Sequence, residues 1–202
     1  MKKVNVIIFG DSLVYGLMDQ SSLGYSLRLK SSFESLKNGI YTFYSLGISG
    51  ETTQDLLNRF ENEAQTRYQS DGDNIIILAT GINDSQLILK EPKVKLNQFQ
   101  DNILKLIKVA QKYSSQIILI GLTRVDEKKV AKSPWQKDHG FNNERIKEFD
   151  SALKAIAIKN NLKYVFLGDV LKTVDLVDGL HPNSRGYQKL YEKIYPVLKS
   201  LV

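Results

Sequence analysis

The sequence predicts an α/β protein built as a three-layer α/β/α sandwich, in which helices cover both faces of a five-stranded parallel sheet. Two observations predict this class. Five short apolar runs are rich in β-branched residues, as is typical of strands buried on both faces. Segments between these runs place apolar residues three or four apart, which indicates helices. The repeated alternation of strand and helix favours a parallel sheet.

The predicted strands cover residues 4–9, 41–46, 74–80, 116–121 and 163–167. The first run follows two lysines and has a superficial likeness to a signal peptide. It contains Asn5, however, and no small-residue cleavage site follows it. We therefore interpret it as a buried strand.

Apolar spacing predicts helices within residues 23–36, 96–110, 146–157 and 184–198. The last is expected to begin near Asn183 or Ser184, after Pro182. No repeat, low-complexity tract or linker interrupts the chain, and its 202 residues fit one domain. We expect residues 1–202 to form that single domain.

Composition argues against several classes of function. The chain has no cysteine, and its two histidines have no carboxylate spacing suited to zinc. No GxGxxG or Walker loop is present, so we expect no cofactor and no metal. The lysines behind the net charge of +6 are spread along the chain, which indicates a solvated surface rather than nucleic-acid binding. No apolar stretch reaches the roughly 20 residues that span a bilayer, so we expect a cytoplasmic protein without stable membrane insertion.

Unusual polar motifs follow three of the predicted strands and precede the last helix. They occupy residues 10–13 (GDSL), 47–52 (GISGET), 81–84 (GIND) and 178–182 (DGLHP). In parallel α/β sheets, ligands bind beyond the carboxyl ends of the strands, so chemistry is expected in these loops.

The residue types in these loops suit acyl transfer. A serine such as Ser12 needs a histidine to take its proton, and the histidine needs a carboxylate to fix its tautomer. His181 and Asp178 are three residues apart, so one tight loop presents both. The developing oxyanion needs preorganised donors, for which a backbone N–H near Gly50 and the side-chain amide of Asn83 are suited.

These motifs together resemble the GDSL (SGNH) hydrolase family, which has a flavodoxin-like α/β/α fold. The four family positions fall on Ser12 in FGDSLVYG, Gly50 in GISGETT, Asn83 in GINDS and His181 in DGLHP. The resemblance implies a catalytic triad of Ser12, Asp178 and His181. It also implies an oxyanion hole formed by the N–H groups of Ser12 and Gly50 and by the Asn83 amide.

Simpler interpretations of the same residues remain open. Ser12 could be a helix N-cap, Gly50 could serve only a turn, and Asn83 could be a turn residue with Asp84 capping the next helix. Asp11 is expected to be structural.

Asp175 is the alternative triad acid and Asp169 a more distant one, while His139 is the only rival base. His139 belongs to a long connection, residues 122–141, which also contains Arg124 and Trp135. Loops of this length are often functional. Trp135 is a candidate for lining the substrate pocket or for pinning this loop.

Val14 is a second candidate for the pocket lining, because many family members carry a small polar residue there. The function that the resemblance implies is hydrolysis of short-chain carboxylic esters, with a small-molecule, glycan or lipid ester as substrate. An acyltransferase, a carbohydrate O-deacetylase or a lysophospholipase would share the triad, and a non-catalytic binding module is the alternative of a different class. The sequence does not reveal the oligomeric state.

Overall fold

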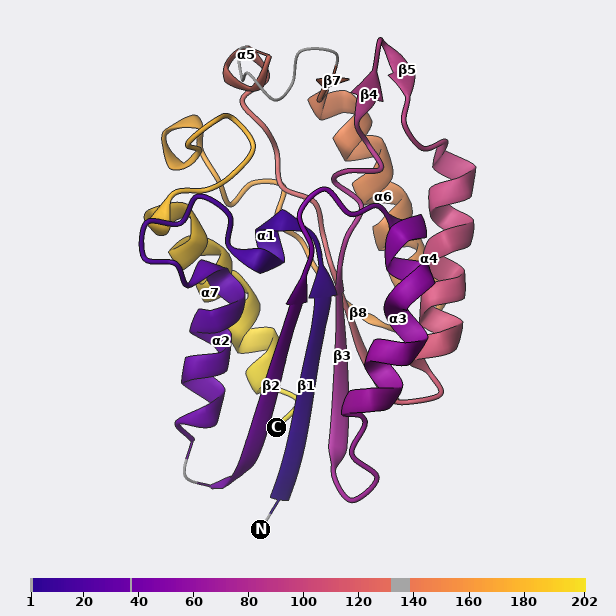
Figure 1. Ribbon diagram of the computed structural model, residues 1–202, viewed down its shortest axis with the longest axis vertical. Helices are drawn as coiled ribbons and strands as arrows, with labels where there is room; N and C mark the ends of the chain where they lie inside the picture. Colours follow the sequence, from indigo (N-terminus) through magenta and orange to yellow (C-terminus); the bar gives the residue numbers. More distant parts are fainter. Residues whose placement is uncertain (1, 37, 132–138) are drawn as a thin grey trace.

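The computed structural model describes residues 2–36, 38–131 and 139–202, and its centre is a five-stranded parallel sheet (Figure 1). The strand order is β2-β1-β3-β6-β8. The strands are β1 (Lys2–Gly10), β2 (Gly39–Gly47), β3 (Asp73–Ala79), β6 (Gln116–Ile120) and β8 (Lys163–Val165). Counted along this sheet in chain order, the arrangement is 2-1-3-4-5, the flavodoxin-like order. The predicted fold class is confirmed.

Helices cover the two faces of the sheet, as Figure 1 shows. One layer holds α2 (Gly24–Glu34) and α7 (Ser184–Lys199), which pack against each other. The other holds α3 (Thr53–Arg67), α4 (Leu96–Ala110) and α6 (Asn143–Lys159). The helices predicted from apolar spacing correspond to α2, α4, α6 and α7.

Successive residues of β1 serve the two cores in turn, because side chains alternate across a strand. Val6 and Ile8 belong to the core under α2 and α7, whereas Ile7 and Phe9 belong to the core under α3, α4 and α6. All four side chains are fully buried. This double burial explains why the strand appears in the sequence as an unbroken apolar run.

Helix α3 is an element that the sequence analysis did not specify. Its buried residues Leu56, Phe60 and Ala64 recur every four positions, so the helical signal was present. The residues between them are mostly polar. A capping box fixes its start, since the Thr52 hydroxyl accepts from the Asp55 N–H and the Asp55 carboxylate accepts from the Thr52 N–H.

The long connection after β6 contains more structure than a loop. It includes α5 (Glu127–Val130) and β7 (His139–Gly140), and β7 pairs with β4 (Leu87–Ile88), which pairs with β5 (Glu91–Pro92). This small antiparallel sheet lies above the carboxyl edge of the main sheet in Figure 1. Trp135 lies outside the described residues. Within the described ranges, no helix has both the length and the apolar character needed to cross a membrane.

Parallel register brings the polar motifs together. Gly10 at the end of β1 is level with Gly47 of β2 on one side and with Ala79 of β3 on the other. The segments that follow these three positions therefore leave the sheet side by side, and they carry Ser12, Gly50 and Asn83.

Candidate active site

Ser12 begins the short helix α1 (Ser12–Tyr15) directly after β1. The preceding residue, Asp11, is the N-cap, and its side-chain oxygen Oδ1 accepts a hydrogen bond from the Leu13 N–H at 2.9 Å. The capping role considered for Ser12 thus falls to Asp11, as the structural interpretation of that residue expected. Ser12 is left with its hydroxyl directed toward the histidine loop, in a largely buried position.

His181 and Asp178 form a compact unit on one turn of chain. Asp178 Oδ1 accepts from the backbone N–H groups of Leu180 (2.9 Å) and His181 (2.7 Å), while Oδ2 lies 2.7 Å from His181 Nδ1. On the far side of the ring, His181 Nε2 lies 3.0 Å from Ser12 Oγ. The structure therefore joins Asp178, His181 and Ser12 in one hydrogen-bonded series.

The Asp178 carboxylate is ionised in this setting. Its partial burial raises the pKa, but hydrogen bonds from the His181 ring, the His181 N–H and the Leu180 N–H outweigh burial and lower the pKa of Asp178 to about 2. A carboxylate on Nδ1 favours the tautomer in which Nδ1 carries the proton and Nε2 is free to accept one.

The alternative acids and the rival base lie elsewhere. The Asp175 carboxylate is buried and binds the Lys189 ammonium at 2.5 Å and the Lys172 N–H at 2.9 Å. Asp169 lines a separate cavity beside Phe166. His139 is exposed on β7, where the backbone pairs with Ile88.

Gly50 and Asn83 open onto the same crevice as Ser12 and His181. This crevice has a volume of about 320 Å³ and is completed by Leu17, Met18, Ser49 and Leu180. Gly50 has φ +81°, and a Cβ there would meet nothing within 4 Å. Its backbone conformation, rather than a lack of space, therefore favours glycine.

Asn83 is held by a partner that sequence reasoning missed. Its Nδ2 donates to the Glu51 carbonyl at 3.0 Å, and the Glu51 carboxylate is clamped by Arg59 through two 2.6 Å contacts. Asp84 does not cap a following helix, because its carboxylate accepts from the Thr53 N–H at the start of α3.

Three donors in this crevice have capacity to spare. Within the described part of the chain, no group accepts a hydrogen bond from the backbone N–H of Ser12 or Gly50. The second N–H of the Asn83 amide is likewise not used in any contact found among those residues. These donors are suited to a developing negative charge on an oxygen beside Ser12.

Val14 does not line the crevice. Its side chain has no exposed surface and packs in the core under α2 and α7. The reason is helical direction, since Val14 and Ser12 project from different sides of the single turn of α1. The apolar wall comes instead from Leu17 and Met18, immediately after that turn. Leu17 and Met18 follow Gly16 in the sequence, close behind the GDSL motif. That position was the sequence signal that could have identified them as part of the crevice wall.

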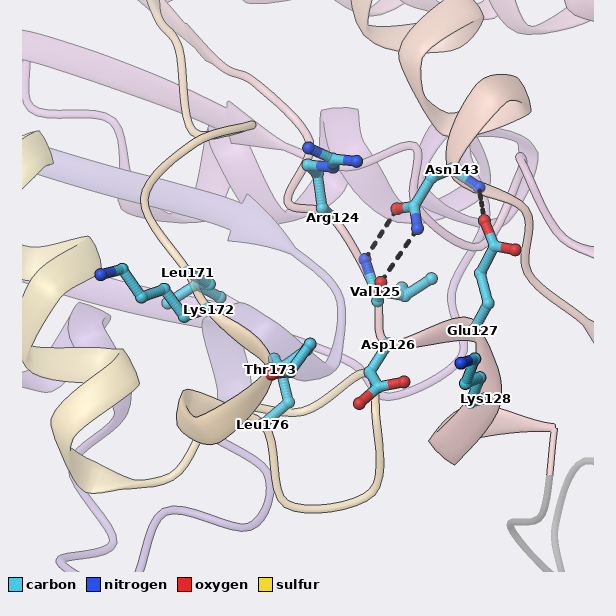
Figure 2. A pocket seen from close by; sticks show the side chains of 10 residues that line it. All are labelled: Arg124, Val125, Asp126, Glu127, Lys128, Asn143, Leu171, Lys172, Thr173 and Leu176. Carbon is cyan, nitrogen blue, oxygen red and sulfur yellow. Dashed lines mark hydrogen bonds between the residues drawn. The ribbon is translucent and has the colours of Figure 1, made fainter.

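A larger cavity, about 580 Å³, lies away from Ser12 (Figure 2). Arg124 and Lys172 are among its lining residues, and the Asn143 amide spans the Val125 N–H and C=O at 3.0 Å each. The crevice over Ser12 is the smaller of the two, yet it holds the predicted nucleophile Ser12, the predicted base His181 and the unused donors. We therefore place the candidate active site in the smaller crevice.

No metal centre accompanies this site in the described ranges, where no group of three or more histidine, aspartate or glutamate side chains could hold an ion. The fold and the site define an α/β protein of flavodoxin-like order with a serine, a histidine and an aspartate linked in series at the carboxyl edge of its sheet.

The sequence model of the GDSL-like lipase/acylhydrolase family matches residues 8–189. The chain belongs to this family, as the resemblance of its motifs indicated.

The sequence identity to individual relatives is low. The chain is similar to an isoamyl acetate-hydrolyzing esterase of Saccharomyces cerevisiae, with 27% identity over 144 residues. That match covers 62% of this chain and 58% of the yeast protein.

Among solved structures, a lipase/acylhydrolase from Enterococcus faecalis is similar with a TM-score of 0.72 and 22% identity, over 99% of this chain and 96% of that one. An acetylxylan esterase from Geobacillus stearothermophilus is similar with a TM-score of 0.72 and 17% identity, over 95% of this chain and 92% of that one. At these identities the structures show the shared fold.

Proposed function

We propose that the protein is a serine ester hydrolase that forms an acyl-enzyme on Ser12. The observation that carries the proposal is the hydrogen-bonded series from Asp178 through His181 to Ser12, with contacts of 2.7 and 3.0 Å. Membership of the GDSL-like lipase/acylhydrolase family supports it. The roles assigned to the three residues follow from which atoms meet.

In the first step His181 Nε2 takes the proton of Ser12 as Oγ attacks the ester carbonyl carbon. Asp178 holds the ring through Nδ1 and stabilises the imidazolium that forms. His181 then gives the proton to the leaving alcohol. In the second step the same nitrogen takes a proton from water, the hydroxide attacks the acyl-enzyme, and the acid leaves as the proton returns to Ser12.

The carbonyl oxygen becomes negative in both steps. The N–H groups of Ser12 and Gly50 and the second N–H of the Asn83 amide receive it. Preorganised donors of this kind stabilise the transition state more than the substrate, because they are aimed at charge that exists only there. The Glu51–Arg59 ion pair keeps the Asn83 amide in place through the Glu51 carbonyl.

Short-chain carboxylic esters fit this crevice best. About 320 Å³, partly open to solvent and walled by Leu17, Met18 and Leu180, leaves room for a small acyl group. Two of the similar proteins are named for acetyl esters, isoamyl acetate in one case and acetylxylan in the other. Acetyl esters of a small alcohol or of a sugar are therefore the first substrates to assay.

A p-nitrophenyl ester series from acetate to decanoate tests the proposal. We expect kcat/KM to be highest for acetate or butyrate and to fall for longer chains. Ser12→Ala should lose turnover by a factor on the order of 10⁶, since removal of a triad nucleophile leaves only the contribution of binding and of the oxyanion hole.

An optimum at long chains would contradict the short-chain assignment but leave the esterase assignment standing. Full activity in Ser12→Ala would contradict the acyl-enzyme on Ser12. Product analysis with an added alcohol separates hydrolysis from acyl transfer, since a transferase yields a new ester rather than the free acid.

A further inference from the structure

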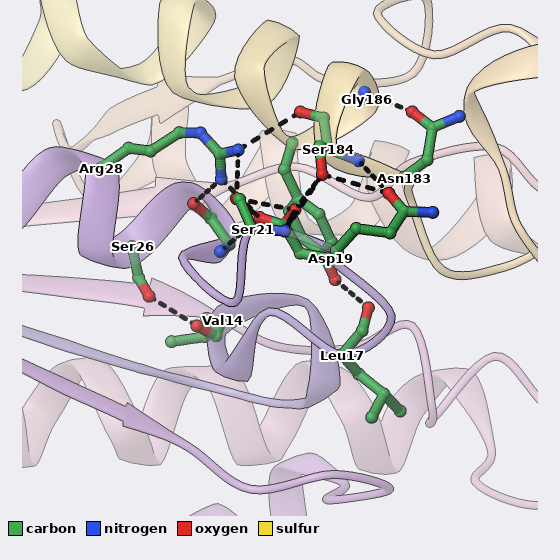
Figure 3. Close-up of polar contacts among 12 residues, drawn as sticks. Val14, Leu17, Asp19, Ser21, Ser26, Arg28, Asn183, Ser184 and Gly186 are labelled. Atoms are coloured by element: carbon green, nitrogen blue, oxygen red, sulfur yellow. Dashed lines mark hydrogen bonds and ion pairs between the residues drawn. The ribbon is translucent and has the colours of Figure 1, made fainter.

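Asp19 lies in the connection between α1 and α2, and its carboxylate is fully buried. Oδ1 accepts hydrogen bonds from the Ser21 N–H at 3.0 Å and from the Ser184 hydroxyl at 2.5 Å. Oδ2 accepts from the Gly24 N–H at 2.8 Å and from Arg28 Nη1 at 2.6 Å. We call these five residues the Asp19 cluster, and Figure 3 shows Ser21, Arg28 and Ser184 gathered around the Asp19 carboxylate.

The Asp19 cluster connects the two segments that carry the proposed nucleophile and base. Asp19 follows Ser12 by one short helix and a turn, whereas Ser184 lies three residues beyond His181. Arg28 strengthens the same link, because Nη2 donates to the Ser184 carbonyl at 3.4 Å. The 3.0 Å contact between Ser12 and His181 therefore has a second, partly buried connection beside it.

The connection that carries Asp19 has a conformation that the backbone alone disfavours. Met18 and Ser22 have φ angles of 66° and 58°, in the left-handed region that residues other than glycine rarely adopt. The Tyr187 hydroxyl fixes this connection again by donating to the Leu17 carbonyl at 2.8 Å. The hydrogen bonds to Asp19 thus offset the local strain.

We propose that Asp19 is a positioning residue for ester hydrolysis: by tying the α1–α2 connection to the start of α7, it keeps His181 Nε2 within hydrogen-bond distance of Ser12 Oγ. The inference rests on the proposed function of those two residues. Asp19 touches no substrate and acts through the geometry of the other two. Small displacements between reacting groups cost large factors in rate, so this geometry matters for kcat.

Asp19 is present as the carboxylate. Burial by itself raises its pKa, but the Arg28 guanidinium and the hydroxyl and backbone donors of Ser184 and Ser21 outweigh burial and hold the pKa of Asp19 well below its usual range. An asparagine of the same shape would turn an N–H toward one of these donors and lose the charge that Arg28 requires. Asp19→Asn therefore changes the side-chain volume little but removes the ion pair with Arg28 and at least one of the hydrogen bonds to the carboxylate.

The test compares Asp19→Asn, Ser184→Ala and Ser184→Thr with the wild-type protein. Rates are expressed per active serine, counted by stoichiometric fluorophosphonate labelling, so that a smaller folded fraction does not count as slower chemistry. We expect kcat to fall at least about tenfold in Asp19→Asn and in Ser184→Ala, with KM changed less than about threefold. Ser184→Thr keeps the hydroxyl and should restore most of the rate.

Ser114→Ala is the matched control. Ser114 also has a buried hydroxyl that donates to backbone carbonyls, but it lies at the start of β6, at the opposite end of the sheet. We expect it to lower the melting temperature and leave kcat unchanged. The inference fails if Asp19→Asn and Ser184→Ala keep kcat within twofold of this control, or if Ser184→Thr is as slow as Ser184→Ala. A wild-type protein that neither turns over esters nor labels at Ser12 would instead overturn the proposed function, and this inference with it.

Discussion

The two oxygen atoms of Asp178 bond to different parts of its own loop. Oδ1 holds the backbone of Leu180 and His181, and Oδ2 holds the His181 ring. One carboxylate therefore shapes the loop and orients the ring of the proposed base at the same time. Asp175, the other acid considered from the sequence, is committed to Lys189 and to the Lys172 N–H.

Replacement of Asp178 by asparagine should show which of the two acids, Asp178 or Asp175, supports His181. An asparagine can present its N–H₂ group to Nδ1 and so favour the tautomer that cannot accept the Ser12 proton, and in a comparable triad this change lowers kcat by about 10⁴-fold. We expect a loss of that order in Asp178→Asn, measured as kcat on p-nitrophenyl acetate. Asp175→Asn, the control, should lower stability and leave kcat nearly unchanged. The reverse pattern would make Asp175 the triad acid.

At the scale of elements, the loop that carries His181 is set against α5. The Asp126 N–H donates to the Gly179 carbonyl at 2.8 Å, and the Lys129 ammonium donates to the Leu176 carbonyl at 2.6 Å. Gly179 has φ +97°, and a Cβ there would lie 2.4 Å from the Val130 nitrogen. Only glycine allows the loop and the helix to approach so closely.

Gly179→Ala should therefore displace the His181 loop. The left-handed conformation alone costs about 1–2 kcal/mol for alanine, and the contact with α5 adds to this. We expect thermal unfolding at a lower temperature together with a large loss of fluorophosphonate labelling. Gly140→Ala is the matched control, because its Cβ would meet nothing within 4 Å. Equal behaviour of the two variants would show that the approach to α5 does not position the base.

The sequence predicted the elements whose signals are local. Five buried runs gave the five strands of the main sheet, and Asp178 and His181 could be paired because they are three residues apart. The two-residue strands β4, β5 and β7 could not be predicted, because they exist only through pairing with one another. The contact of Asp19 with Ser184 joins residues 165 positions apart, and neither has a motif that marks it.

At the scale of the whole molecule, two kinds of buried carboxylate act oppositely on stability. Asp19 and Asp178 have lowered pKa values, so their stabilising contacts are present above the usual carboxyl range and are lost in acid. Burial raises the pKa of Asp11 from 3.8 to about 7; the hydrogen bond from the Leu13 N–H opposes the rise, and the charges of Asp84 and Glu51 add to it. Ionising Asp11 therefore costs stability.

The unfolding free energy should accordingly fall between about pH 4 and pH 7. In that window folded Asp11 keeps a proton that the unfolded chain has released, so each rise in pH favours unfolding. The full loss is up to about 4 kcal/mol, since one pKa unit corresponds to about 1.4 kcal/mol. Urea unfolding at a series of pH values measures it. Asp11→Asn should remove most of this slope, and Asp101→Asn, on the exposed surface of α4, should keep it. An unchanged slope in Asp11→Asn would show that Asp11 is ionised at low cost.

The most direct test of the central claim, that Ser12 is an activated nucleophile, is covalent labelling with a fluorophosphonate followed by intact-mass and peptide-mass analysis. We predict one adduct per chain, located on Ser12, absent from Ser12→Ala and formed far more slowly in His181→Ala. Labelling that persists in Ser12→Ala, or that proceeds at the wild-type rate without His181, would contradict the account.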